Sequence, residues 1–167
     1  MPEWDIFIKE IRKEMTLKAG QRCTGVRRIF APNNKLEDIS RFLSTALSQT
    51  LIGNPLHDKV RMGSLAGQDQ RKEVRGQVQK LLASSRIIYG SLDSVEVIDA
   101  QADAGAFMSP LLLMNENPFG CTEPHDVEAF GPVSTVMPYT TTDEAIALAR
   151  RGRGSLVSSV FTQDPDF

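Results

Sequence analysis

A cysteine at the junction of two predicted elements is the first residue in this sequence that is suited to chemistry. Cys23 follows Gly20-Gln21-Arg22 at the point where a helical pattern gives way to a short apolar run. The thiolate is the nucleophilic form of cysteine, and nearby cations favour it. Arg22, Arg27 and Arg28 supply such charge, although a strand turns at most one of the last two toward the thiol. The alternative is a small buried side chain, because free cysteines are commonly buried.

The segment from Glu128 to Pro132 holds a second candidate pair. Glu128 and Phe130 lie two residues apart, so on an extended segment both side chains point the same way. They would present a carboxylate acceptor for hydroxyl groups beside an apolar surface, which suits a sugar joined to a flat ring. A solvated Glu128 next to a core Phe130 is the alternative that composition alone favours.

The remaining reactive side chains give weaker signals. His57 and His125 have no partner four residues away on a helix, so they predict surface histidines and no metal site. Cys121 lies in a loop with no basic neighbour nearer than His125, and we expect it to be inert. The run Arg150-Arg151-Gly152-Arg153 ends a predicted helix, where cations complement the helix dipole, and contact with a phosphate is the alternative.

The composition excludes several classes of protein. With 167 residues, 24% of them charged, and a net charge of -2, the chain matches an average soluble domain better than a disordered or nucleic-acid-binding one. Two cysteines are too few for a disulfide framework, which favours the reducing cytoplasm. No apolar run reaches the roughly 18 residues of a membrane-spanning helix, and the first residues do not resemble a signal peptide.

Hydrophobic periodicity divides the chain into alternating helices and strands. Gly20 is a natural stop for the first helix, Asn33 or Asn34 can cap the second, and Thr141 with Glu144 has the spacing of a capping box. This alternation favours an α/β fold of three layers, helix, sheet and helix, with a largely parallel sheet. The predicted helices cover residues 4–19, 36–47, 69–82 and 142–149, and the predicted strands cover residues 26–30, 87–89, 107–114, 133–139 and 156–162.

Short motifs spread along nearly the whole chain give a more specific signal when they are taken in order. They are Gly20-Gln21-Arg22-Cys23-Thr24, Met62-Gly63-Ser64-Leu65, Phe107-Met108-Ser109-Pro110, Glu128-Ala129-Phe130-Gly131-Pro132-Val133, Asp143-Glu144-Ala145-Ile146 and Ser159-Val160-Phe161-Thr162. In this order they resemble the aldehyde dehydrogenase superfamily. One position departs from the family pattern, because Ser64 stands at the usual proline of a Gly-Pro-Leu loop.

The resemblance implies roles for three of the candidate residues. Cys23 would be the nucleophile that attacks an aldehyde, and its own N–H would help to hold the oxyanion. Glu128 would hydrogen-bond the nicotinamide ribose of NADP (or NAD), and Phe130 would pack near the nicotinamide. A closer similarity, over residues 14–24 and 154–157, is to the family branch that acts in phenylacetate and benzoyl-CoA degradation. That branch implies a CoA-linked semialdehyde as substrate.

The same resemblance indicates what the chain lacks. The family's N-terminal cofactor-binding domain, general-base glutamate, oxyanion-hole asparagine and C-terminal oligomerisation segment have no counterpart here. Residues 1–167 are therefore expected to be one incomplete domain of a cytoplasmic homo-oligomer, inactive alone, with NADP (or NAD) bound mainly by the absent domain. No metal, nucleic acid or membrane would take part. Two alternatives are a non-catalytic α/β binding or assembly module of the same fold, and a cysteine hydrolase with His125 as the base for Cys23.

Overall fold

A computed structural model describes residues 2–164, with side chains from Trp4 onward. Two short 3-10 helices, η1 (Leu17–Gly20) and η2 (Asn33–Lys35), precede β1 and α2 respectively. The α-helices are α1 (Pro2–Thr16), α2 (Leu36–Ser48), α3 (Gln68–Leu81), α4 (Glu123–Asp126) and α5 (Thr142–Arg150), and the strands are β1 (Arg28–Pro32), β2 (Arg86–Tyr89), β3 (Leu111–Met114) and β4 (Val133–Tyr139).

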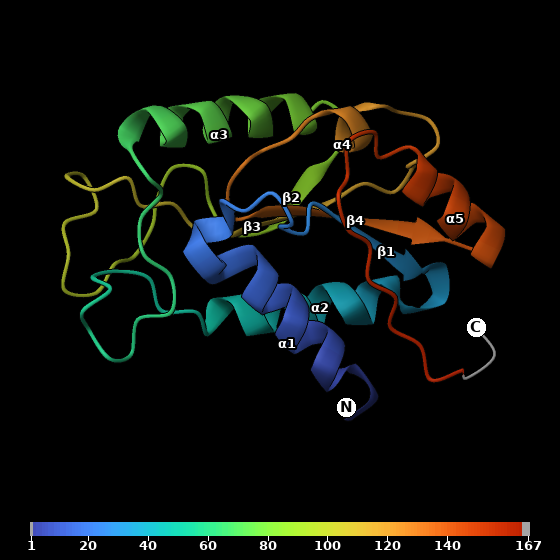
Figure 1. Ribbon diagram of the computed structural model, residues 1–167, viewed down its shortest axis with the longest axis horizontal. Coiled ribbons are helices and arrows are strands. Elements are labelled where there is room, and N and C mark those ends of the chain that lie inside the picture. Colours follow the sequence, from blue (N-terminus) through green and yellow to red (C-terminus); the bar gives the residue numbers. More distant parts are fainter. Residues whose placement is uncertain (1, 165–167) are drawn as a thin grey trace.

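The strands form one sheet in the order β1-β4-β3-β2. β1, β4 and β3 run parallel, whereas β2 pairs antiparallel with β3 at one edge. Figure 1 shows α1 and α2 on one face of this sheet and α3 on the opposite face. The predicted three-layer α/β fold with a largely parallel sheet is therefore confirmed.

β3 separates the hydrophobic core into two halves because its side chains alternate between the faces of the sheet. Leu112 and Met114 belong to the cluster formed with α1 and α2. Leu111 and Leu113 belong to the cluster formed with α3. All of these side chains are buried, so a strand of only four residues contributes to both layers of the core.

The connection from α1 to β1 has a strained backbone. Lys18 and Ala19 have φ angles of 54° and 52°, in the left-handed region that a side chain with a Cβ rarely occupies. Gly20 continues the run with a φ of 70°. The α-helix itself ends at Thr16, so the predicted helix over residues 4–19 with its stop at Gly20 is three residues too long. Three consecutive left-handed residues turn the chain sharply and set the position of the cysteine that follows.

The two capping predictions have different outcomes. The Thr141 Oγ1 accepts a hydrogen bond from the Glu144 N–H at 3.2 Å, so the predicted cap at Thr141 is confirmed. The return bond of the box is shifted by one residue, because the Glu144 Oε2 accepts from the Thr140 N–H, at 2.6 Å, in place of the Thr141 N–H. The prediction for α2 is wrong, because Lys35 occupies the cap position and makes no side-chain cap. Asn33 and Asn34 are taken up in the 3-10 turn that precedes this helix.

Two strand predictions are corrected. Of residues 107–114 only Leu111–Met114 form a strand, and residues 156–162 form none. The latter segment has no ladder partner among the described residues, and Leu156, Val160 and Phe161 are 67%, 67% and 43% exposed. Its only ring contact within the described chain is that of Phe161 with Phe7, at a centroid distance of 5.3 Å. Among residues 2–164 no helix combines the length and apolar character needed to span a membrane.

Candidate active site

Cys23 lies in a tight turn between η1 and β1, as the sequence predicts. The turn is closed by a hydrogen bond from the Gly25 N–H to the Arg22 carbonyl at 3.0 Å. The Cys23 side chain is exposed, which excludes the alternative of a buried small hydrophobe. Within the described residues the Cys23 N–H donates no hydrogen bond, and the thiol is exposed.

The side chains next to Cys23 anchor this turn to two helices. The Gln21 Oε1 accepts a hydrogen bond from the Ala66 N–H at 2.8 Å, in the loop before α3, and the Gln21 Nε2 donates one to the Gln70 Oε1 at 3.3 Å. On the other side, Arg22 forms an ion pair with Glu14 of α1 at 2.9 Å. Sequence reasoning did not single out Gln21 for this role, because its partners lie far along the chain.

Glu128 and Phe130 lie on an extended segment that leads into β4. Their exposure alternates in the predicted way, since the Glu128 side chain is 51% exposed, Ala129 is 5% exposed and Phe130 is 39% exposed. Both side chains of the candidate pair therefore reach solvent on the same side of the segment. Phe130 is not part of the core, contrary to the alternative that composition favours.

The cysteine turn and the Glu128 segment meet at the amino-terminal ends of β1 and β4. The Ser134 Oγ donates a hydrogen bond to the Val26 carbonyl at 2.7 Å, and the Thr135 N–H donates one to the Arg27 carbonyl at 2.8 Å. An ion pair links the Arg27 Nε to the Glu128 Oε1 at 3.7 Å. The parallel pairing of these two strands thus brings the segments that carry Cys23 and Glu128, which are distant in the sequence, to the same end of the sheet.

The backbone of η1 and the backbone of the segment before β4 lie closer together than they could with a side chain between them. A Cβ added at Gly20 would overlap with the carbonyl group of Gly131 and would lie 2.8 Å from the Cα of Pro132. η1 can therefore contact the segment before β4 only because residue 20 is a glycine. This contact fixes the position of Cys23 relative to Glu128 and Phe130.

The arginines around Cys23 are engaged by other groups. Arg22 pairs with Glu14, and Arg27 pairs with Glu128, so carboxylates offset both charges. Arg28 donates hydrogen bonds to the Leu148 and Ala149 carbonyls at 2.9 and 3.2 Å. Burial, and after it the charge of Arg27, lowers the pKa of Arg28 from its usual value. The cationic surroundings that the sequence predicts for Cys23 are present, but they are largely compensated.

The prediction of a surface histidine at position 125 is wrong. His125 is only 3% exposed, and its Nε2 lies 2.8 Å from the Pro118 carbonyl while its Nδ1 lies 3.2 Å from the Arg28 Nη1. These partners replace water around the ring, so the histidine can be buried. Within the described residues no hydrogen bond joins His125 to Cys23, and the arrangement gives no support to a cysteine hydrolase with His125 as its base.

The other reactive side chains have structural surroundings. Cys121 is half-buried, and its Sγ accepts a hydrogen bond from the Asn115 Nδ2 at 3.2 Å and donates one to the Asn117 carbonyl at 3.4 Å. The His57 Nδ1 accepts a hydrogen bond from the Lys59 N–H at 3.2 Å. In the part of the chain that the structure describes, no group of three or more His, Cys, Asp or Glu side chains is placed to hold a metal ion.

Comparison with known proteins identifies the class to which this fold and site belong. The sequence model of the Aldehyde dehydrogenase family matches residues 3–166, and the chain therefore belongs to this family. It is 40% identical to the 3,4-dehydroadipyl-CoA semialdehyde dehydrogenase of Aromatoleum evansii, over 99% of this chain and 32% of that protein. It is also 38% identical to protein MaoC of Klebsiella aerogenes, over 60% of this chain and 29% of that protein.

Solved structures agree with this assignment. The aldehyde dehydrogenase of Mycobacterium tuberculosis complexed with NAD+ is similar with a TM-score of 0.74 and 28% identity, over 85% of this chain and 28% of that one. An aldehyde dehydrogenase of Bacillus cereus shares the fold with a TM-score of 0.79 and 22% identity, over 97% of this chain and 32% of that one. The chain spans about a third of the length of the curated relatives that it matches.

Proposed function

We propose that this chain is the nucleophile-bearing part of an aldehyde dehydrogenase that oxidises a CoA-linked semialdehyde formed during the degradation of aromatic compounds. The family membership supports aldehyde oxidation. The name of the Aromatoleum evansii relative, which matches over 99% of this chain, supports the CoA-linked semialdehyde. The related pathway of phenylacetate breakdown fits the same chemistry.

One observation carries this proposal. The exposed thiol of Cys23 and the exposed side chains of Glu128 and Phe130 are held at neighbouring strand ends, by the pairing of β1 with β4 and by the contact of Gly20 with Gly131. This arrangement supports a role for Cys23 as the nucleophile and for Glu128 and Phe130 as a binding surface for a sugar and a flat ring. A binding or assembly module without redox chemistry would need no exposed thiol at this place.

In the proposed mechanism the Cys23 thiolate attacks the aldehyde carbon and forms a C–S bond. The carbonyl oxygen becomes an alkoxide, and the unpaired N–H of Cys23 donates a hydrogen bond to it, a contribution that in other enzymes is worth about 2.7–4 kcal/mol per donor. Collapse of this thiohemiacetal restores the C=O bond and expels a hydride, which leaves a thioester on Cys23. Water then hydrolyses the thioester, releasing the acid and the free thiol.

The cofactor of the proposed reaction is NADP (or NAD), which would accept the hydride. The residues present fit a dinucleotide. The Glu128 carboxylate has acceptor capacity for the ribose hydroxyl groups, because its single ion pair with Arg27 is long, at 3.7 Å. The exposed ring of Phe130 offers an apolar surface next to it. No protein group in this scheme needs a metal ion.

We further infer that residues 1–167 are one incomplete domain of a longer parent. The chain spans about a third of its curated relatives, and the remaining cofactor contacts would come from an N-terminal domain of that parent. A C-terminal segment would make the parent a homo-oligomer in the cytoplasm. The isolated chain would then bind cofactor weakly and would not turn over aldehyde.

The parent protein provides the direct test. We expect it to reduce NADP or NAD in the presence of a CoA-linked semialdehyde, and the Cys23→Ala variant to lose this activity by several orders of magnitude. The matched control is Cys121→Ala, which removes the other thiol and should leave the rate unchanged. Aldehyde oxidation that survives in Cys23→Ala would contradict the proposal and would favour a non-catalytic role for this segment.

A further inference from the structure

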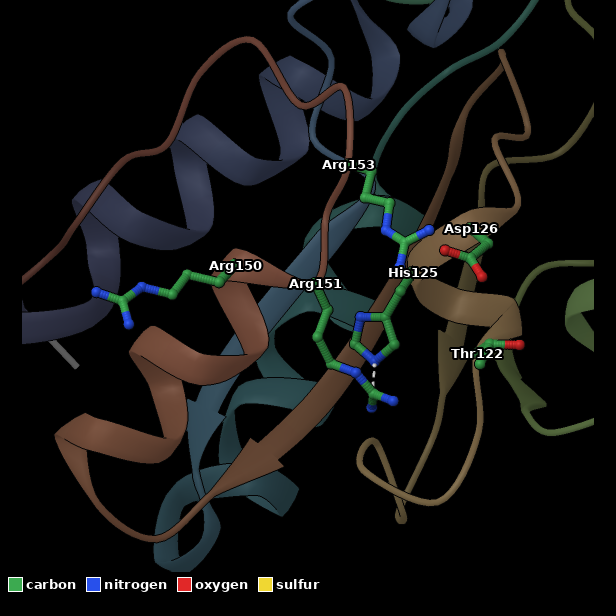
Figure 2. Close-up of a pocket in the computed structure, with 6 residues that line it drawn as sticks. All are labelled: Thr122, His125, Asp126, Arg150, Arg151 and Arg153. Carbon is green, nitrogen blue, oxygen red and sulfur yellow. Dashed lines mark hydrogen bonds between the residues drawn. The ribbon is translucent and has the colours of Figure 1, made fainter.

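A pocket of about 270 Å³ lies at the carboxyl end of α5, and it is distinct from the cysteine site. Figure 2 shows the residues that line it. Three arginines come from the end of α5 and the turn that follows, and three residues come from α4 and its start. The lining residues are Thr122, His125, Asp126, Arg150, Arg151 and Arg153.

We propose that this pocket binds a phosphate group, either as inorganic phosphate or as the end of a phosphate monoester. The guanidinium groups of Arg151 and Arg153 would supply planar donors that match phosphate oxygens. The volume is slightly below that of pockets for drug-sized ligands, which suits a small anion or one end of a longer molecule. The proposal does not depend on aldehyde oxidation.

The arginines of this pocket form no ion pair in the described residues, although the carboxylate of Asp126 lines the same pocket. Within the described residues Arg150, Arg151 and Arg153 form no ion pair, and neither does Asp126. Arg151 donates to the carbonyl oxygen of Pro118, an uncharged acceptor, and its Nη1 lies 3.4 Å from the His125 Nε2. Unpaired guanidinium groups around one cavity favour an anion as its occupant.

Arg28 adds a further positive charge behind the pocket. Its guanidinium lies against the His125 ring and beneath the turn of Gly152, where a Cβ would overlap with it. Arg28 and Arg151 thus approach the two nitrogens of His125 from opposite sides. Burial is the largest cause of the lowered pKa of His125, and the charges of Arg151 and Arg28 lower this pKa further. The Pro118 carbonyl and the Asp126 carboxylate act in the opposite direction. The lowered pKa agrees with a positive potential in the pocket.

The backbone holds Arg153 in a defined place. The Ser155 N–H donates to the Gly152 carbonyl at 3.1 Å, and the Arg153 N–H donates to the Arg151 carbonyl at 3.0 Å. In Figure 2 the Arg153 side chain points toward Asp126 and His125, whereas Arg150 points away from the other five residues. Two neighbouring arginines therefore provide a test variant and a matched control.

Calorimetric titration with inorganic phosphate and with adenosine monophosphate, at constant ionic strength set with chloride, tests the proposal. We expect saturable binding. Arg153→Ala should weaken the binding about tenfold, because it removes one charge-assisted hydrogen bond. The control Arg150→Ala should change the affinity by less than about twofold. Asp126→Asn should bind several-fold more tightly, because it removes the opposing carboxylate. The Arg153 side chain makes no hydrogen bond in the described chain, so its removal should leave the melting temperature unchanged.

Nuclear magnetic resonance of the His125 ring gives a second measurement. A bound dianion should raise the pKa of His125, because it offsets the charges of Arg28 and Arg151. Tighter binding of adenosine monophosphate than of phosphate would assign the site to a monoester, and the reverse would assign it to free phosphate. Binding of neither, or equal losses in Arg153→Ala and Arg150→Ala, would overturn the proposal.

Discussion

The Cα of Gly20 packs against the carbonyl group of Gly131, and this contact joins the turn that carries Cys23 to the segment that carries Glu128. The two glycines are far apart in the sequence. Gly131 is itself enclosed, because a Cβ there would lie 2.9 Å from a methyl carbon of Val74 in α3. The site therefore depends on a backbone-to-backbone contact between Gly20 and Gly131, and Gly131 packs in turn against the Val74 side chain of α3.

Substitution of Gly20 should be strongly destabilising. We expect Gly20→Ala to lower the free energy of unfolding by about 2–5 kcal/mol, from roughly 1–2 for the left-handed backbone and roughly 1–3 for the overlap with Gly131. Urea denaturation measures this change. The control is Gly76→Ala in the exposed part of α3, where nothing lies within 4 Å and alanine should stabilise the helix by about 0.5–1 kcal/mol. Similar effects of the two variants would show that the close contact is unimportant.

The reactivity of the two cysteines should differ. Cys23 is exposed, whereas the Cys121 Sγ is half-buried and hydrogen-bonded to Asn115 and Asn117. Iodoacetamide should therefore modify Cys23 at a rate close to that in the unfolded chain, and Cys121 several-fold more slowly. Peptide mass mapping over time separates the two sites. Faster modification of Cys121 than of Cys23 would be inconsistent with the exposed turn.

His125 should make stability depend on pH. Burial lowers the pKa of His125 in the folded chain, so below the unfolded value of about 6.5 the unfolded state binds more protons. The contribution of His125 is fully present above about pH 6.5 and is lost as the pH falls through its folded pKa. Urea denaturation from about pH 5 to about pH 7.5 should show this slope, and His125→Gln should flatten it. His57 is present in both the original chain and the variant, so its effect on the pH dependence cancels in the comparison. If the free energy of unfolding changes with pH equally in both proteins, His125 is not the source of the pH dependence.

Glu128 should matter for the cofactor and little for stability. Its exposed ion pair with Arg27, at 3.7 Å, is worth at most about 1 kcal/mol, so Glu128→Ala should unfold at nearly the same urea concentration. In the parent protein we expect this variant to raise the KM for NADP or NAD about tenfold, through loss of charge-assisted hydrogen bonds to the ribose. Steady-state kinetics with varied cofactor tests this. A loss of stability with an unchanged KM would assign Glu128 a structural role.

The isolated chain should not oxidise aldehydes. It contains the candidate nucleophile but, under the proposed function, lacks most of the cofactor site and the general base. The measurement is aldehyde-dependent reduction of NADP or NAD by the 167-residue chain, with Cys23→Ala as the control for background. Activity above that control would show that this segment is sufficient for catalysis.

Local sequence patterns predicted the helices and strands whose own residues specify them. The same patterns gave wrong predictions where the burial or pairing of a residue depends on partners far away in the sequence. β4 forms over Val133–Tyr139 as expected, because its β-branched and apolar residues suit an inner strand of the sheet. His125 was missed because its burial depends on Arg28 of β1 and on Arg151 beyond α5. Residues 156–162 have the composition of a strand, but a strand also needs a neighbour, and the described sheet provides none.

For the site residues, too, the sequence predicted some features and only the fold revealed the others. The type and spacing of Cys23, Glu128 and Phe130 could be recognised in the sequence. Their proximity could not be derived from periodicity, since it arises from the pairing of Arg28 with Thr135 in the register of β1 and β4. The anchoring role of Gln21 was equally hidden, because Ala66 and Gln70 are partners only in the folded chain.

The position of β4 has a consequence for how the chain folds. β4 is the last strand in the described sequence, yet it lies between β1 and β3 in the sheet. During synthesis the cysteine turn is made before β4, and in the described sheet β1 has no neighbour until β4 has been made and has inserted beside it. Such long-range pairing is slow because loop-closure entropy must be overcome before any contact is gained. The turn of Cys23 is thus set in place only after β4 has paired with β1, so in a nascent or incompletely folded chain it is not yet held at the same end of the sheet as the segment of Glu128 and Phe130.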